Sequence, residues 1–169
     1  GVQITPGEQP IPNLKPASAQ ANQSLELGLL RTLNQRHLKP RDSDNALKAR
    51  MSSFETANGL QAEAPTIMDL SRESKSTFEL YGATPDEPTS YAAQVIMARR
   101  MIESGVRFVE VIDAVGACRD NWDAAHRDIA SHEKYAKRVD QPAAALIKDL
   151  KQRGLLDEVL IVFCTEFGR

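Results

Sequence analysis

This chain of 169 residues has few cysteines, little excess of charge of either sign and no long apolar run. Two cysteines, Cys118 and Cys164, are too few for a disulfide framework, and because both lie in or near apolar segments we expect free, buried thiols. No apolar run approaches the roughly 18 residues that a membrane span needs. Lysine and arginine total 21 against 23 aspartates and glutamates, a net charge of −2, which argues against a protein that holds nucleic acid through phosphate charge.

The remaining composition is that of a globular protein, with 41% hydrophobic and 26% charged residues. The length fits one domain, or one piece of a larger α/β domain. Proline is concentrated at the start, where residues 1–16 hold four of the nine prolines. Because proline fixes φ and lacks a backbone donor, we expect residues 1–20 to form an extended leader.

Residues 21–104 are predicted to be mainly helical, because apolar side chains recur there at helical spacing between start and stop signals. Pro40 ends the first helix, the cluster Asp42–Asp44 supplies caps for the second, and Gly82 ends the third. Apolar residues lie nearly all round the fourth helix, which predicts that it is buried. The predicted helices cover residues 21–37, from the cap cluster to about 61, 74–81 and 90–104.

Residues 105–169 change to the order strand, loop, helix, strand. Val106–Asp113 is rich in β-branched residues, and Val159–Thr165 is a continuous apolar run typical of a strand buried on both faces. A single crossover between them predicts two parallel strands, adjacent or next but one. The predicted fold class is therefore α/β, an incomplete parallel-sheet core with a helix-rich N-terminal half.

The helix between the two predicted strands contains Pro142, which is awkward inside one continuous helix. We therefore favour two helices, the second capped by Asp140 with Pro142 in its first turn and ended by Gly154. Arg99–Arg100 and Lys148–Arg153 are expected to form ordinary polar helix faces.

Polar residues follow both predicted strands, and ligands of an open α/β sheet bind beyond the carboxyl ends of its strands. Asp123 and His126 follow the first strand, and Glu166 follows the second. Two carboxylates and an imidazole suit a divalent metal such as zinc or manganese. Arg169 could grip an anionic substrate, and Trp122 could line the pocket.

A simpler interpretation of the same residues stays open. Asp123 could merely cap the helix that follows Trp122, and His126 could be a solvated helix residue, because an aspartate and a histidine three apart are common by chance. Arg169 could be solvated, and Trp122 could only pack. His132 is expected at the surface.

Several stretches of the chain resemble a known family, most specifically the Asp140-Gln-Pro helix and the ending Thr165-Glu-Phe-Gly-Arg169. They are residues 98–110, 121–123 and 135–169. The chain is similar over nearly its whole length to an uncharacterised bacterial sulfatase-like family, a domain of unknown function within the alkaline-phosphatase-like superfamily. The resemblance implies a parallel sheet flanked by helices, with divalent metals held by Asp123, His126 and Glu166.

The chain departs from the superfamily pattern at two points. Sulfatases usually place Asp and then His where this chain has Glu166 and Phe167, and the pair Asp123 and His126 is spaced one residue shorter. The superfamily nucleophile would lie upstream and a further Asp-His pair downstream, so the resemblance implies a central fragment. We expect a divalent metal in the intact protein, whereas this chain alone should be inactive and bind metal weakly or not at all. Family members are often exported, which implies the periplasm or cell surface.

Two functions from different classes follow. The first is a metal-dependent hydrolase of phosphate or sulfate esters, acting on a small anionic substrate with no nucleic-acid partner. The alternative is a non-catalytic sulfatase-like module that binds a partner or a surface, which the altered Glu166–Phe167 motif favours. A third interpretation is a structural segment whose polar loops are only solvated.

Overall fold

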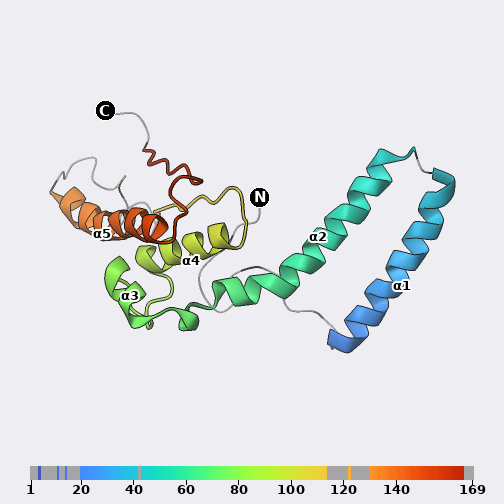
Figure 1. Cartoon of the computed structure of the whole chain (residues 1–169), viewed down its shortest axis with the longest axis horizontal. Helices are drawn as coiled ribbons and strands as arrows, with labels where there is room; N and C mark the ends of the chain where they lie inside the picture. The colour runs from blue at the N-terminus through green and yellow to red at the C-terminus, as the bar shows by residue number, and fades with distance from the viewer. Residues whose placement is uncertain are drawn as a thin grey trace. The chain divides into compact units, whose positions relative to one another are not determined.

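The computed structural model describes residues 20–41, 43–113 and 130–165, together with Ile4, Ile11, Leu14 and Trp122. The chain forms two compact units, Gly1–Met68 and Asp69–Arg169, which are called the first and the second unit below. The regular secondary structure of the described residues is entirely helical (Figure 1).

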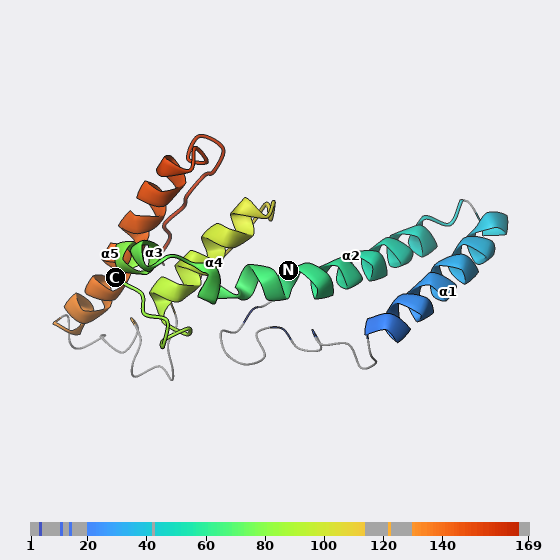
Figure 2. The ribbon, with the colours of Figure 1, turned by 60° about the horizontal axis from the view of Figure 1, so that its bottom comes forward.

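The first unit contains two antiparallel helices that lie side by side (Figure 2). Its elements are α1 (Gln20–Leu38), the short 3-10 helix η1 (Lys39–Arg41) and α2 (Asn45–Met68). Asp44 caps α2 by accepting a hydrogen bond of 2.9 Å from the backbone N–H three residues on. Both predicted helices are thus confirmed, although α2 continues past the expected end near residue 61 and through Pro65.

Few contacts hold these two helices together. The side-chain amide of Gln23 donates to that of Gln61 at 2.8 Å, and Arg31 lies 3.3 Å from Glu55 in an ion pair whose side chains are both exposed. The buried side chains of the described part of this unit are Ile11 and Ala64. The leucines whose spacing predicted α1 are exposed: Leu25, Leu29, Leu30 and Leu33. Phe54 on α2 is exposed as well.

The second unit is built from three helices that pack against one another. Its elements are the 3-10 helix η2 (Leu70–Arg72), α3 (Lys75–Tyr81), α4 (Tyr91–Glu103) and α5 (Ser131–Gln152). Ser74 caps α3 and Ser90 caps α4, each by accepting a hydrogen bond from a backbone N–H three residues on. Gly82 ends α3 with φ +66°, a left-handed conformation that favours glycine. The predicted helices α3 and α4 are therefore confirmed.

The core of the second unit lies where α4 is covered by α3 and α5. Seven of the eight residues from Ala92 to Arg99 are buried, the exception being the polar residue at position 94, as an all-round apolar helix predicts. Phe78 and Tyr81 of α3 and Ala145 of α5 complete the same cluster. α4 is thus covered by α3, α5 and η2, which fits its small amount of polar surface.

The prediction of two helices divided at Asp140 is wrong, because α5 is one helix from Ser131 to Gln152 with Pro142 inside it. An interior proline removes one helix hydrogen bond and costs about 3 kcal/mol in isolation. Here Pro142 is itself buried between Val139 and Ala145 on the face that packs against α3 and α4. Apolar burial along this face offsets the lost hydrogen bond and keeps the helix continuous.

The predicted parallel-sheet core of the α/β class is also wrong for the residues that the structure describes. Val106–Asp113 and Val159–Thr165 contain neither helix nor strand, so the expected parallel pair is not formed. A strand exists only when its backbone N–H and C=O groups pair with a neighbouring strand. No backbone–backbone hydrogen bond joins residues 107–113 or 159–164 to another described segment. An apolar, β-branched composition predicts a strand, but it does not supply the partner that a strand needs.

The two former strand candidates leave large apolar side chains in solvent. Phe108 is 82% exposed and Leu160 is 88% exposed, and Ile112, Val162 and Phe163 are exposed as well. Cys164, in the second segment, is a free thiol as predicted, but it is exposed rather than buried. Cys118 lies outside the described residues. Val111 forms an exception, because it packs against the α3–α4–α5 core.

Candidate functional site

Of the five predicted site residues, the structure describes Trp122. The proposed ligands Asp123, His126 and Glu166 and the proposed anion-binding Arg169 lie outside the described residues, as does the expected distance between the carboxylates of Asp123 and Glu166. The sheet that would have brought these residues to one edge is not formed, so the topological reason for their meeting no longer holds. Their roles as ligands stay predictions.

Trp122 lies in a cluster of polar and aromatic side chains, called the Trp122 cluster below. Its members are Asp113, Trp122, His132, Tyr135 and Arg138. The indole N–H of Trp122 donates a hydrogen bond of 2.7 Å to Oδ2 of Asp113. Its ring lies 5.8 Å from the ring of His132 and 5.5 Å from that of Tyr135, both tilted by about 45°. Trp122 is thus packed against the first half of α5, and its predicted role in substrate binding stays a prediction.

Arg138 provides the positive charge of this cluster. Its Nη2 donates to Oδ2 of Asp113 at 2.9 Å and lies 2.8 Å from Oδ1, and its guanidinium sits 5.1 Å above the ring of Tyr135. The carboxylate of Asp113 is mostly buried and also acts on Tyr91. Burial first, and then the negative charge of Asp113, raise the pKa of Tyr91.

A second concentration of charge lies between the helices of the second unit, called the Arg99 network below. Arg99 is 2% exposed and its guanidinium contacts three carboxylates: Glu73 at 2.6 Å, Glu103 at 2.6 Å and Asp149 at 3.2 Å. Two further arginines and one tyrosine close the network around these acids. Arg100 contacts Glu73, Arg153 contacts both Asp149 and Glu103, and the hydroxyl of Tyr81 donates to Asp149 at 2.9 Å.

The electrostatics of the Arg99 network keep Arg99 and Glu73 charged. Burial alone would lower the pKa of Arg99, but Glu73 and Glu103 outweigh it and raise that pKa. Burial alone would raise the pKa of Glu73, but hydrogen bonds from Arg99 and Arg100 lower it below its ordinary value of 4.5. Arg99 and Glu73 therefore stay charged near neutral pH, and the network links α3, α4 and α5 rather than serving as an acid–base pair.

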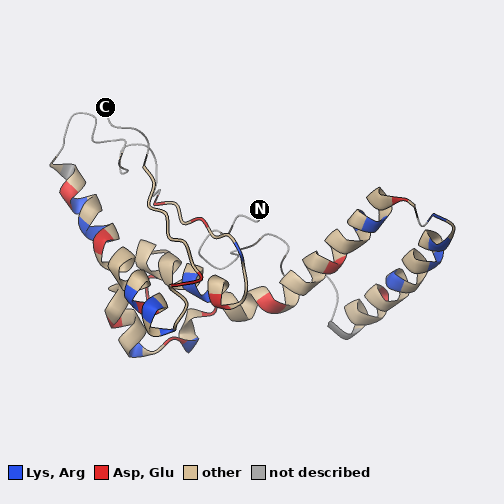
Figure 3. Ribbon diagram, turned by 45° about the horizontal axis from the view of Figure 1, so that its top comes forward, with Lys and Arg blue, Asp and Glu red and all other residues tan. Residues whose placement is uncertain are grey.

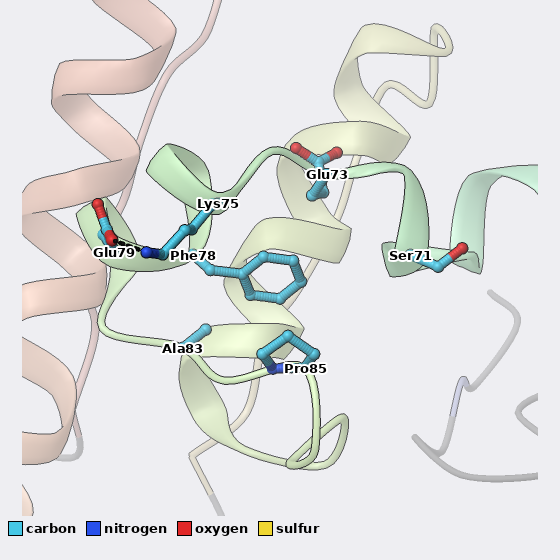
Figure 4. Close-up of a pocket in the computed structure, with 7 residues that line it drawn as sticks. All are labelled: Ser71, Glu73, Lys75, Phe78, Glu79, Ala83 and Pro85. Carbon is cyan, nitrogen blue, oxygen red and sulfur yellow. Dashed lines mark ion pairs between the residues drawn. The ribbon is translucent and has the colours of Figure 1, made fainter.

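An open hollow of about 620 Å³ lies on the second unit beside α3 (Figure 4). The ring of Phe78 lies between Glu73 and Pro85 in it, and Lys75 and Glu79 on its rim neutralise each other in an ion pair of 3.6 Å. Glu73 is engaged by Arg99 and Arg100. The hollow therefore offers apolar surface but no converging polar groups, and it contains none of the predicted site residues.

Two further properties concern the described residues as a whole. No three side chains of His, Cys, Asp or Glu among them come together in a group that could hold a metal ion. None of the described helices is both long and apolar enough to cross a membrane. Acidic and basic residues instead occur together along helices such as α5 (Figure 3).

The family model for "Protein of unknown function (DUF1501)" matches residues 1–169. The chain belongs to the DUF1501 family. No curated protein and no solved structure matches it. Membership confirms the part of the resemblance that pointed to a domain of unknown function, and the match covers the DUF1501 chain from the first residue to the last.

Sequence reasoning missed the Arg99 network of this DUF1501 chain, because Arg99 and Arg100 were expected on a polar face. The signal was present: a helix that is apolar all round buries any charged residue in it, and Arg99 has Glu103 one turn later. His132 was expected at the surface, yet its ring packs against Trp122 and its Nδ1 is buried. No spacing rule links His132 to Trp122, because the contact depends on the path of the chain between them.

Proposed function

We propose that this chain contributes metal ligands to a metal-dependent hydrolase of phosphate or sulfate esters. Asp123, His126 and Glu166 are the proposed ligands, and Arg169 is proposed to bind the anionic group of the substrate. The observation that supports the proposal is the fixed position of Trp122, the residue before Asp123, on Asp113 and α5. Catalytic loops carried by a rigid support are a common feature of enzymes.

The donor set fits a divalent metal by its chemistry. Carboxylate oxygens and an imidazole nitrogen are the ligands of zinc and manganese sites, and Asp123 and His126 are close in sequence. When bound, such a metal polarises an ester oxygen and stabilises charge that develops in the transition state. Arg169 would orient the phosphate or sulfate group through its planar guanidinium. The nucleophile is proposed to lie outside this chain.

A non-catalytic binding module is the second candidate, and one observation favours it. Phe108, Ile112, Leu160 and Phe163 are exposed in the segments that form no strand. Exposed apolar side chains gathered in this way are typical of surfaces that contact another molecule. A module of this kind would need neither Glu166 nor a metal.

The experiment that separates the two uses the full product of the gene that encodes this chain. The protein is stripped with a chelator, and hydrolysis of an aryl phosphate and an aryl sulfate is measured as zinc, manganese, magnesium or calcium is returned. Asp123→Asn and Glu166→Gln should each lower kcat/KM by more than about 100-fold, since even an outer partner of a metal ligand is worth roughly 10–100-fold. Asp157→Asn, at an exposed position, is the matched control.

Two results would contradict the hydrolase. One is activity that survives chelation, and the other is unchanged kcat/KM in Asp123→Asn and Glu166→Gln. The chain of 169 residues by itself should bind zinc weakly or not at all in calorimetry, because three ligands leave an incomplete shell. Sub-micromolar binding by that chain would contradict this expectation.

A further inference from the structure

We propose that Asp113 is a positioning residue, which holds the indole of Trp122 and thereby fixes the start of the segment that carries Asp123. The inference rests on the proposed function for the role of Asp123, but the contact that carries it lies among described residues. Asp113 ends the segment Val106–Asp113, and Trp122 lies nine residues further on. Their hydrogen bond of 2.7 Å therefore ties Trp122 to the end of that segment.

The carboxylate of Asp113 already binds the indole N–H of Trp122 and the guanidinium of Arg138. Oδ2 accepts from Trp122 Nε1 at 2.7 Å and from Arg138 Nη2 at 2.9 Å, while Oδ1 lies 2.8 Å from the same Nη2. Only 12% of the Asp113 side chain is exposed. A charged carboxylate is a stronger acceptor than a neutral amide, and it is needed to compensate a partly buried guanidinium. Oδ1 accepts no hydrogen bond from the described residues, so the positioning role rests on Oδ2, which accepts from both Trp122 and Arg138.

The rings fix the orientation that the hydrogen bond alone leaves free. Trp122 packs against His132 and Tyr135, one turn apart on α5, and Arg138 lies over the second of these rings. Asp113 and α5 thus hold the indole from its polar edge and from its ring. Because the next residue in the chain is Asp123, fixing Trp122 restricts where the backbone of Asp123 begins. Outer partners of this kind commonly set the geometry of a metal ligand.

Fluorescence tests the contact in the chain of 169 residues, because Trp122 is its single tryptophan. Asp113→Asn should shift the emission maximum and the acrylamide quenching constant toward those of the urea-unfolded chain, while far-ultraviolet circular dichroism keeps its helical signal. Glu110→Gln, an exposed change on the same segment, is the matched control and should leave both unchanged. Wild-type fluorescence in Asp113→Asn overturns the proposal.

Trp122→Phe provides a second variant that leaves the Asp113–Arg138 ion pair intact, in case Asp113→Asn disturbs folding. It keeps a packing ring and removes only the donor. In the full gene product, Asp113→Asn and Trp122→Phe should each raise the metal concentration for half-maximal ester hydrolysis by roughly 10–100-fold, with activity recovered at saturating metal. The double variant should lose little more than Asp113→Asn alone, because both changes remove the Asp113–Trp122 hydrogen bond.

The outcomes separate this proposal from the one on which it rests. Asp123→Asn should not recover activity at any metal concentration. A merely misfolded Asp113→Asn would not respond to metal either. Recovery of activity in Asp113→Asn at saturating metal is therefore expected only from the positioning role. Wild-type metal dependence in Asp113→Asn, with activity lost in Asp123→Asn, overturns the positioning role alone. Absence of metal-dependent hydrolysis in the wild type overturns the proposed function and the positioning role together.

Discussion

The two units of this chain are built from the same kind of element, yet they bury very different amounts of their surface. In the first unit four leucines of α1 are exposed (Leu25, Leu29, Leu30 and Leu33), and the contacts of α1 with α2 include a glutamine pair and an exposed ion pair. In the second unit α4 is covered by α3 and α5, and the buried Arg99 of α4 pairs with Glu73, which lies just before α3, and with Asp149 of α5. Helical sequence is common to both, whereas packing is concentrated in one.

This difference shows that helix formation and helix burial have separate causes. Spacing of apolar residues and capping residues determine where a helix forms, and both units have these signals. Most of the stability of a helix in a protein comes from packing of its apolar face. We therefore expect equivalent substitutions in the two units to have unequal effects, and the contrast can be broken by pairs of matched variants.

The largest contrast is expected between two arginines. Arg99→Ala leaves Glu73, Glu103 and Asp149 without their central partner, and breaking a buried ion pair on one side costs about 3–5 kcal/mol. Arg31→Ala removes an exposed ion pair, which is worth about 0–1 kcal/mol. Urea unfolding followed by circular dichroism measures both. Equal losses for the two variants would remove the distinction between the units.

Two leucines provide the next test. Leu150 of α5 is 1% exposed, and Leu150→Ala should lower the free energy of unfolding by about 2–5 kcal/mol through lost burial and a cavity. Leu29 of α1 is exposed, and Leu29→Ala should change it by less than about 0.5 kcal/mol. The same urea titration applies. A large loss for Leu29→Ala would mean that the α1 stripe is covered in solution.

Two glycines should respond with opposite signs. Gly82 has φ +66°, and a Cβ there would lie 2.7 Å from the side-chain amide oxygen of Gln141, so Gly82→Ala should cost at least about 1 kcal/mol. Gly59 lies inside α2 with no atom within 4 Å of an added Cβ, so Gly59→Ala should stabilise by about 0.5–1 kcal/mol. Thermal unfolding followed by circular dichroism gives both signs. A stabilising Gly82→Ala would contradict the left-handed end of α3.

The smallest effect is a dependence on acid pH that belongs to the second unit. Burial raises the pKa of Glu73, but its hydrogen bonds from Arg99 and Arg100 outweigh this and lower it below 4.5. The folded state then binds a proton less readily than the unfolded state, so the contribution of Glu73 is fully present above pH 4.5 and is lost as the pH falls further. The free energy of unfolding, measured by urea titration across this pH range, should depend less steeply on pH in Glu73→Gln than in the wild type. Exposed Glu55→Gln should keep the slope of the wild type.

The helices could be predicted from the sequence because their signals are local. Ser74, Ser90 and Gly82 mark helix ends wherever the rest of the chain lies, and the all-round apolar pattern of α4 implied its burial. Pro142 misled for the opposite reason, since its cost is decided by packing against other helices. The sequence alone does not decide whether local propensity or tertiary packing determines the structure at such a residue.

Whether a sheet forms, and which side chains meet in the Trp122 cluster, could not be predicted from local signals, because both depend on partners distant in sequence. Val106–Asp113 and Val159–Thr165 have the composition of strands, but pairing requires a neighbour in register. The Trp122 cluster joins Asp113 to residues of α5 up to 25 positions away. No motif contains that contact, although Trp122 itself was singled out because it precedes Asp123.

Hydrogen exchange of backbone amides tests the central claim most directly: the stable core of this chain is the helical packing of α3, α4 and α5, not a sheet. Amides of α4 and of the buried half of α5 should exchange slowest, at rates near those set by global unfolding. Amides of residues 107–113 and 159–164 should exchange fast, because no backbone–backbone hydrogen bond joins them to another described segment. Slow exchange in both of those segments, matching that of α4, would require a hydrogen-bonded sheet and would contradict the account.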